Sequence, residues 1–317
     1  MLLFVRAGFR ATVFLALFTL PDLSAMAQKV VESDVAYAPA GCPRCFDITY
    51  EDGNDARQLI VFVHGGGWVA GAHNTPTIQQ IGDRLYDDGF AFASIEYRKL
   101  RTDQSTPLVD DSIEVDDLEL VAKDVARAVA TIQRKRELGG YNFSQSTIVL
   151  MGHSAGAHLA ALVSSNPVLV DSVNYGDHSA ISGLVLLDGH TYDLQQSETE
   201  RPGWLAARNI DPADWDNLSP VYHLGLWAPQ HPPAFFATGL ATQDPPQPSH
   251  VNFPYSREQA INYRQEINAN AVAQGGSVYT EFRTYGSKNH TEFLGDLRIA
   301  ADRLPLELIA FIQAHAN

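Results

Sequence analysis

The sequence predicts one domain of the α/β class, with a mostly parallel sheet that helices cover on both faces. The first observation is a series of short apolar runs, typical of fully buried strands, at residues 59–63, 148–151, 184–187 and 234–239. The second is the helical pattern between Asp117 and Leu138, where apolar residues recur every three or four positions. Strands that alternate with helices indicate a parallel sheet between two helical layers.

Further strands are predicted around this series. Residues 46–50 alternate between apolar and polar side chains, and a turn follows them. Residues 90–95 form another apolar run, and residues 278–283 form a last strand before a C-terminal helix. No internal repeat or low-complexity linker divides the chain, so we expect a single domain over residues 28–317.

The most specific motif is Gly-His-Ser-Ala-Gly at residues 152–156, between a predicted strand and the helix-forming stretch at 157–162. Such a sharp turn needs glycine on both sides of its centre, and it exposes the central side chain at the carboxyl edge of the sheet. The start of the next helix directs N–H groups to the same place, where they stabilise negative charge. The motif therefore predicts that Ser154 is a nucleophile. His153 is predicted either to line the substrate site or to pack inside the turn.

A second motif, His-Gly-Gly-Gly-Trp at residues 64–68, follows the apolar run at 59–63. Three successive glycines cost backbone entropy and add no packing, which indicates that the bare backbone must approach a ligand. We predict that the N–H groups of Gly66, Gly67 and Ala155 form an oxyanion hole, and that Trp68 borders the substrate pocket. An ordinary glycine-rich turn is the alternative, and the presence of both motifs, each after a buried strand, argues against it.

Together the two motifs resemble those of the α/β-hydrolases, and within them the HGGGW esterases related to hormone-sensitive lipase, carboxylesterases and arylformamidases. The sequence at residues 152–159 is most similar to the small esterase and formamidase branches. The stretch before residues 64–68 is short for the helical cap of the lipase branch, which argues against that branch. The resemblance implies an α/β-hydrolase fold, a Ser-His-Asp triad and an acyl-enzyme, without a cofactor or metal.

The resemblance also implies that the acid and the histidine follow Ser154 in that order. His290 lies in a polar loop between the last predicted strand and the C-terminal helix, so it is the candidate base. The family places the acid after the next-to-last strand, and Asp244 is the first carboxylate beyond residues 234–239. Asp244 is therefore preferred. Asp188, at the end of the run 184–187, is second and Glu198 third.

Residues 190–233 form a long segment, rich in tryptophan and proline, between two predicted strands. We interpret this segment as a possible small cap insertion. Its tryptophans, Trp204, Trp215 and Trp227, either wall an acyl or alcohol pocket or pack beneath a long loop.

Residues 1–27 have the pattern of a secretory signal peptide. Arg6 and Arg10 precede an apolar stretch, and Ser-Ala-Met-Ala at 24–27 ends in a small-x-small cleavage pattern. The apolar stretch of about ten residues is too short to span a bilayer. We expect cleavage after Ala27, no membrane anchor afterwards and a secreted or periplasmic location. The net charge of −15 makes nucleic acids and anionic membranes poor partners.

The two cysteines, Cys42 and Cys45, lie three positions apart. In an exported chain this spacing predicts a local disulfide. A redox-active pair is the alternative, but no thioredoxin-like pattern surrounds it. A zinc site needs more ligands than two cysteines, and the spacing of the histidines does not indicate them, so no metal site is predicted.

These observations favour an exported serine hydrolase that cleaves small carboxylic esters and requires no cofactor. An amidase of the arylformamidase type is the first alternative, because the same machinery cleaves activated amides. The second is a noncatalytic binding module on the same fold, a class that usually lacks the nucleophile or the histidine. The sequence makes no prediction of oligomeric state.

Overall fold

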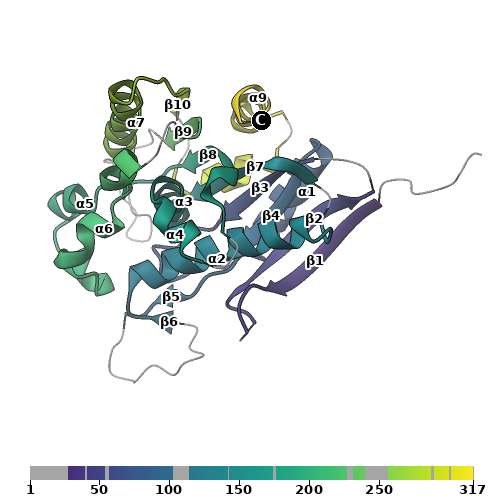
Figure 1. Cartoon of the computed structure of the whole chain (residues 1–317). Helices are drawn as coiled ribbons and strands as arrows, with labels where there is room; N and C mark the ends of the chain where they lie inside the picture. The colour runs from purple at the N-terminus through teal and green to yellow at the C-terminus, as the bar shows by residue number, and fades with distance from the viewer. Residues whose placement is uncertain are drawn as a thin grey trace, which may run out of the picture.

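The computed structural model describes residues 28–39, 41–53, 57–102, 114–141, 143–173, 176–226, 231–239, 256–286, 289–299 and 301–316. The predicted signal peptide, Trp227 and Asp244 lie outside these residues. The described chain forms an eight-stranded sheet with helices on both faces (Figure 1). The predicted α/β class is therefore confirmed. None of the described helices is long and apolar enough to cross a membrane.

The strands of the main sheet lie in the order β1-β2-β4-β3-β7-β8-β9-β10. Their bounds are β1 Gln28–Ala36, β2 Cys45–Asp52, β3 Arg57–Val63, β4 Ala91–Ile95, β7 Phe143–His153, β8 Ile181–Leu187, β9 Ala234–Gly239 and β10 Thr280–Tyr285. β2 pairs antiparallel with both β1 and β4, and the strands from β4 to β10 are parallel. A small second sheet pairs β5 (Lys99–Leu100) with β6 (Glu114–Val115).

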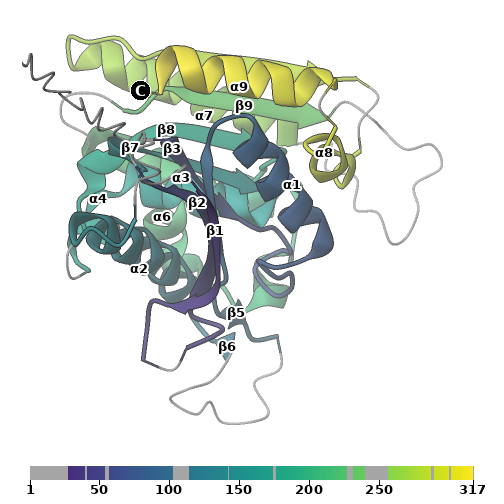
Figure 2. The same ribbon diagram turned by 90° about the vertical axis from the view of Figure 1, so that its right-hand side faces the viewer.

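Two helical layers cover the sheet, and each closes its own apolar core. On one face lie α2 (Leu118–Glu137), α3 (Ala155–Ser165), α4 (Pro167–Asp171) and α7 (Ser256–Ala273); on the other lie α1 (Pro76–Asp87), α8 (Glu292–Asp296) and α9 (Arg303–His315) (Figures 1 and 2). Val61 of β3 packs with the first layer, and its neighbours Ile60 and Phe62 pack with the second. Because both faces of β3 are buried, the strand is apolar at every position from Leu59 to Val63.

The predicted insertion at residues 190–233 lies between β8 and β9. Its elements are α5 (Leu194–Glu200), η2 (Ala206–Arg208), η3 (Pro212–Asp214), α6 (Trp215–Leu218) and η4 (Pro220–Leu226). Leu194, Leu205 and Leu218 are buried and belong to the same core as α3. The segment is thus a chain of short helical turns that is anchored on the domain by its apolar side chains.

Candidate active site

Ser154 lies at the sharp turn between β7 and α3, as the sequence predicted. Its backbone has φ 56° and ψ −123°, a region that costs a non-glycine residue energy. The N–H group of Ser154 donates to the carbonyl oxygen of Leu187 at 2.9 Å, and its own carbonyl accepts from the N–H group of Ala157 at 2.9 Å. These bonds to β8 and α3 hold the turn in its strained form.

The glycines beside Ser154 are required by close backbone contacts. A Cβ atom on Gly152 would lie 2.2 Å from the carbonyl oxygen of Gly156. A Cβ atom on Gly156 would lie 2.1 Å from the carbonyl oxygen of Val63, at the end of the neighbouring strand β3. Any larger residue at either position would force the turn away from the sheet.

Three side chains form a hydrogen-bonded chain at the carboxyl edge of the sheet. Nε2 of His290 lies 2.7 Å from Oγ of Ser154, and Nδ1 of His290 lies 2.6 Å from Oδ2 of Asp188. Ser154 follows β7, Asp188 follows β8, and His290 lies in the loop after β10. The structure therefore brings together the serine and the histidine that the sequence predicted.

Among the described residues, the carboxylate bonded to His290 is the second choice of the sequence analysis. Asp244 lies outside the described residues, and the carboxylate that contacts His290 is Asp188, the second choice. The reason is strand order: β8 pairs directly with β7, so the residue after β8 lies beside the serine turn. β9 contributes backbone instead, because the N–H group of Gly239 donates to Oδ1 of Asp188 at 3.0 Å.

Glu198, the third candidate, has a different role. Its carboxylate accepts hydrogen bonds from the N–H groups of Gly203 and Leu205, the second at 3.0 Å. Glu198 therefore stabilises the conformation of the insertion, and its described hydrogen bonds do not include His290.

The charges of the site are set by burial and by these bonds. Burial alone would raise the pKa of Asp188, but the hydrogen bond from His290 and the charge of that ring outweigh it, so the pKa of Asp188 lies below its usual value. Burial, together with the charge of His290, lowers the pKa of His153 to about 3. Asp188 is therefore ionised and His153 neutral at pH 7.

His153 contacts the loop that contains His290 rather than solvent. It is 5% exposed, and its Nε2–H group donates to the carbonyl oxygen of His290 at 2.8 Å. Of the two roles predicted for His153, packing in the turn fits this position, and lining the substrate site does not. The hydrogen bond to the loop was not predicted, because only the folded chain brings residue 290 to this place.

The glycine-rich loop lies against the serine turn. A Cβ atom on Gly65 would lie 3.0 Å from Cβ of Ser154. Gly66 and Gly67 have φ values of 124° and 61°, which favour glycine. Within the described residues, no backbone-to-backbone hydrogen bond uses the N–H group of Gly66 or Gly67. These two N–H groups are the donors that the sequence analysis assigned to the oxyanion hole.

Buried side chains hold the glycine-rich loop through hydrogen bonds to its carbonyl groups. Nδ1–H of His64 donates to the carbonyl oxygen of Gly65 at 2.7 Å, and the Tyr97 hydroxyl donates to the carbonyl oxygen of His64 at 2.8 Å. Burial lowers the pKa of His64, so the ring is neutral and its Nε2 atom accepts from Nζ of Lys99 at 3.2 Å. Glu96 pairs with Lys99 and lies 3.3 Å from Nε2 of His64. The sequence analysis missed these supporting residues.

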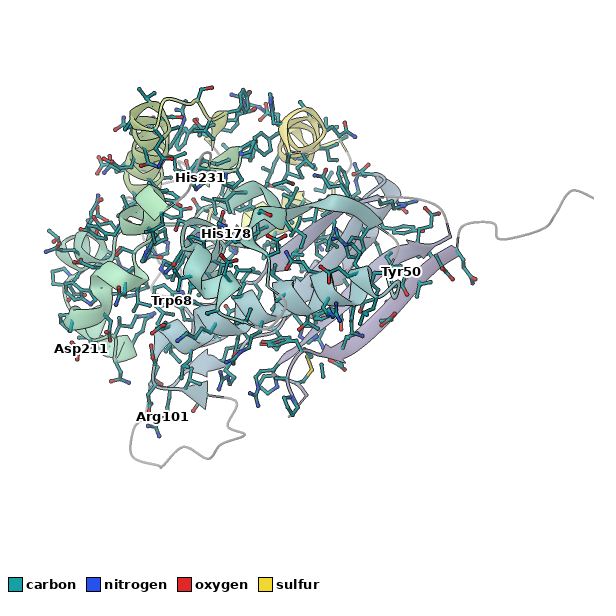
Figure 3. All side chains as sticks on the ribbon, in the orientation of Figure 1. Tyr50, Trp68, Arg101, His178, Asp211 and His231 are labelled. Atoms are coloured by element: carbon teal, nitrogen blue, oxygen red, sulfur yellow. A yellow bond between two sulfur atoms is a disulfide. The ribbon has the colours of Figure 1, made fainter. Side chains whose placement is uncertain are left out.

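Trp68 does not border a pocket with its own surface, contrary to the prediction. Trp68, labelled in Figure 3, is fully buried, and its ring centroid lies 5.1 Å from that of Trp204 and 5.1 Å from that of His158. Trp204 is only partly buried, and the guanidinium of Arg208 lies 4.2 Å from its ring centroid. Nε of Arg208 donates to the carbonyl oxygen of Gly67 at 3.2 Å. The insertion thus contacts the glycine-rich loop directly, and Trp68 packs behind it.

The sequence matches a known protein family. Residues 46–246, which include the glycine-rich loop, Ser154 and Asp188, match the family BD-FAE. The chain belongs to the BD-FAE family. BD-FAE is an α/β-hydrolase esterase family, which agrees with the predicted resemblance and with the eight-stranded, mostly parallel sheet.

A curated relative of this BD-FAE chain is a probable isoprenylcysteine alpha-carbonyl methylesterase from Oryza sativa subsp. japonica. It is 31% identical over 103 residues, which cover 32% of the BD-FAE chain and 21% of the relative. The match therefore spans about a fifth of that protein's length.

Solved structures share the fold of the BD-FAE chain. A bifunctional GH43-CE protein from Bacteroides eggerthii superposes with a TM-score of 0.66 and 20% identity, over 90% of the BD-FAE chain and 38% of the other. Esterase B from Lactobacillus rhamnosis superposes with a TM-score of 0.64 and 16% identity, over 90% and 85% of the two chains. At these identities the similarity shows the α/β-hydrolase fold.

Proposed function

We propose that this BD-FAE chain is a carboxylic ester hydrolase with Ser154 as its nucleophile, His290 as its general base and Asp188 as the acid. The observation that carries the proposal is the continuous chain from Oγ of Ser154 to Nε2 of His290 at 2.7 Å and from Nδ1 to Oδ2 of Asp188 at 2.6 Å. Membership of an esterase family supports the same reaction.

The reaction starts when His290 takes the proton of Ser154 as Oγ attacks the ester carbonyl. Negative charge then develops on the carbonyl oxygen, and the N–H groups of Gly66, Gly67 and Ala155 stabilise it. His290 returns the proton to the leaving alcohol, which leaves an acyl group on Ser154. Water, activated by His290, then releases the acid and restores the serine.

Asp188 orients His290 through both steps. A carboxylate at Nδ1 fixes the ring tautomer that leaves Nε2 free to accept the serine proton, and it stabilises the imidazolium that forms. Asp188 suits this role because it is 4% exposed and ionised at pH 7. Two hydrogen bonds to β9 hold Asp188 in this orientation. The N–H group of Asp188 donates to the carbonyl oxygen of Ala237, and the N–H group of Gly239 donates to Oδ1 of Asp188.

The proposal is tested by hydrolysis of a series of p-nitrophenyl esters by the wild-type protein and Ser154→Ala. Removal of a triad nucleophile lowers turnover by several orders of magnitude. Ser172→Ala, at an exposed serine outside the site, is the matched control and should retain activity. The profile over acyl-chain length then measures the size of the acyl pocket.

An amidase of the arylformamidase type is the second candidate, because the sequence around Ser154 resembles the formamidase branch as well as the small esterases. The same nucleophile and oxyanion donors cleave activated amides, so paired assays on an aryl ester and on N-formylkynurenine separate the two activities. If folded wild-type protein cleaves neither substrate and does not react with a fluorophosphonate, a noncatalytic binding module becomes the better hypothesis.

We also infer that the protein is exported after cleavage behind Ala27. The charged, apolar and small-residue segments of residues 1–27 support this inference. A disulfide between Cys42 and Cys45 agrees with an oxidising compartment. N-terminal sequencing of the protein from its native source should begin at Gln28, and an intact leader would contradict the inference.

A further inference from the structure

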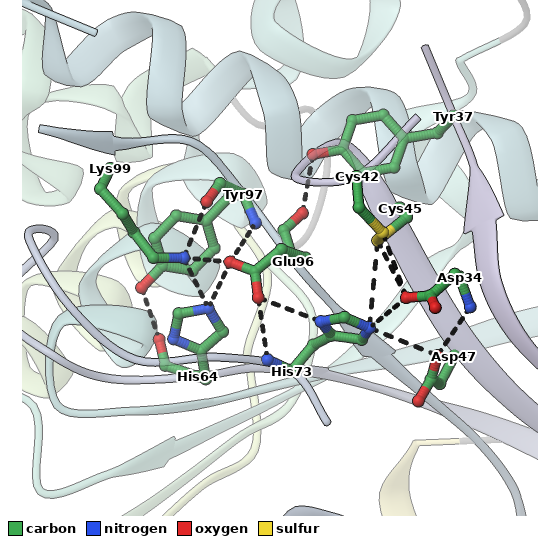
Figure 4. The surroundings of a disulfide bond; sticks show 10 residues. All are labelled: Asp34, Tyr37, Cys42, Cys45, Asp47, His64, His73, Glu96, Tyr97 and Lys99. Carbon is green, nitrogen blue, oxygen red and sulfur yellow. Dashed lines mark hydrogen bonds and ion pairs between the residues drawn. A yellow bond between two sulfur atoms is a disulfide. The ribbon is translucent and has the colours of Figure 1, made fainter. Parts of the chain in front are cut away.

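We propose that the described fold contains a zinc site that is closed by the disulfide and becomes available when the disulfide is reduced. The donors, here named the Cys–His cluster, are the side chains of Asp34, Cys42, Cys45 and His73 (Figure 4). The cluster lies on the β1–β2 side of the sheet and contains no residue of the catalytic chain described above. The proposal is therefore independent of the proposed esterase activity.

The spacing of the donor atoms suits a tetrahedral ion. Oδ1 of Asp34 lies 3.2 Å from Sγ of Cys42 and 3.7 Å from Sγ of Cys45. Nε2 of His73 lies 3.4 Å from the same oxygen and 3.9 Å from Sγ of Cys45. A tetrahedral zinc site with bonds of about 2.0–2.3 Å has ligand-to-ligand separations of about 3.3–3.8 Å. These four separations are close to the tetrahedral values, all donor atoms of the cluster lie within 4.8 Å of one another, and the two bonded sulfur atoms must move apart.

The burial of the cluster gives it a fixed inner side and an accessible outer side. Cys45 is 0% exposed and His73 is 4% exposed, whereas Asp34 and Cys42 are exposed. The inner ligands are thus held by the core, and an ion can reach them past the outer ligands. A metal site needs both a rigid ligand set and a route for the ion.

Carboxylates around the cluster orient its ligands. Nδ1–H of His73 donates to Oε2 of Glu96 at 3.0 Å, which directs Nε2 toward Asp34 and the sulfurs. Histidines that bind metals usually donate their other N–H group to a carboxylate in this way. On the other side, Oδ1 of Asp47 accepts from the N–H group of Asp34 at 2.8 Å, at the irregular register of β1 where φ of Asp34 is 54°. The same oxygen lies 3.3 Å from Nε2 of His73, so this nitrogen must exchange Asp47 for the ion when zinc binds.

The chemistry of the donors selects the ion. Two thiolates, an imidazole and a carboxylate favour Zn²⁺ over harder cations, and the Cys-x-x-Cys spacing is typical of zinc sites. The sequence analysis predicted no metal site because two cysteines are too few. The fold supplies the missing ligands from eight positions before Cys42 and 28 positions after Cys45.

Zinc can bind only after the Cys42–Cys45 disulfide has been reduced. A dithiol reductant gives two electrons and two protons to the Cys42–Cys45 bond, which becomes two thiols while the reductant becomes a disulfide. When Zn²⁺ binds, both thiols release their protons to solvent and the sulfurs bind as thiolates, and Nε2 of His73 binds without a proton. In the oxidised protein the sulfurs are bonded to each other, so two ligands are lost.

Cobalt provides a direct test that does not involve catalysis. The protein is reduced with a dithiol, freed of reductant without oxygen and titrated with Co²⁺, beside a sample with its disulfide intact. We expect the reduced sample alone to show sulfur-to-cobalt charge transfer and the visible bands of tetrahedral cobalt, saturating at one ion per chain. Zn²⁺ should remove these bands. Equal binding by the oxidised sample, or no such bands from folded reduced protein, would overturn the proposal.

Variants identify the ligands. Cys42→Ser should lower the charge-transfer intensity to about half, because one of the two thiolates is lost. His73→Gln and Asp34→Asn should each weaken Co²⁺ binding by about tenfold or more. Asp34→Asn should disturb the fold less than His73→Gln, because asparagine tolerates the left-handed backbone at position 34. His223→Gln, at a partly buried histidine of η4 outside the cluster, is the matched control and should bind as wild type. Unchanged affinity in both ligand variants, with circular dichroism showing them folded, would refute the assigned ligands.

Discussion

Nε2 of His153 donates a hydrogen bond over 2.8 Å to the carbonyl oxygen of His290. Since His153 immediately precedes Ser154, the residue beside the proposed nucleophile also holds the loop of the proposed base. The two histidine rings lie 4.8 Å apart between centroids. The serine-to-histidine distance is therefore fixed from the backbone side as well as through the side chains.

Substitution of His153 should change turnover more than substrate binding. His153→Phe keeps a ring in the turn but removes the donor to His290, so we expect kcat to fall by about tenfold or more while KM changes little. His153→Gln offers an amide N–H group and should recover part of kcat. Steady-state kinetics on one p-nitrophenyl ester measures both values, and a rise in KM at constant kcat would assign His153 to substrate binding instead.

The two candidate acids are separated by a pair of matched amide substitutions. Asp188→Asn should lower kcat by about 10³–10⁴, because an amide at Nδ1 favours the wrong tautomer of His290. Asp244→Asn makes the same chemical change and should leave kcat within a fewfold range, because Nδ1 of His290 is bonded to Asp188. The opposite ranking of the two variants would return the acid role to Asp244.

The oxyanion loop should not tolerate a side chain at Gly66. A Cβ atom there would lie 2.0 Å from the carbonyl oxygen of Ala70, so Gly66→Ala must displace the N–H donors. Loss of one such donor lowers turnover by about 10²–10³. Gly89 also has a positive φ, but no atom lies within 4 Å of its Cβ position.

Gly89→Ala therefore shares the backbone strain without the clash. Both variants should lower the melting temperature, and only Gly66→Ala should lose turnover. Equal activity of the two variants would show that the loop does not provide the donors.

The ionised state of Asp188 predicts how stability depends on pH. Its pKa is lower in the folded protein than the value of about 3.9 expected in the unfolded chain. Its contribution to the free energy of unfolding is then present above about pH 4 and disappears as the pH falls through the folded value. Urea unfolding of the wild type and Asp188→Asn should thus differ more at pH 7 than at about pH 3. A difference that grows at low pH would contradict the sign of this shift.

Much of the fold was predictable because its signals are local. The buried run at 59–63 lies in β3, and the helix expected between Asp117 and Leu138 is α2, whose first turn is capped by the Asp117 side chain at the N–H group of Glu119. β1 and α7 were not predicted. β1 is an exposed edge strand with an irregular register, so it lacks a clear alternation. α7 is rich in asparagine, glutamine and charged residues, so its apolar stripe is narrow.

The site was predictable where a motif fixes the backbone. Ser154 and Gly66 could be identified because close approach of the chain demands glycine at defined positions. The acid could not, because the choice between Asp188 and Asp244 depends on which strand lies next to β7. The same reason applies to Glu96, which contacts His64 and His73 only after β3 and β4 have paired.

The most direct test of the account is covalent labelling of the active serine. Wild-type protein treated with a fluorophosphonate should gain one adduct per chain, which peptide mass spectrometry should locate on Ser154. Ser154→Ala should gain none, and His290→Ala should label far more slowly because Oγ then lacks its base. An adduct on another residue, or equal labelling of Ser154→Ala, would contradict the central claim that Ser154 is the nucleophile and His290 activates it.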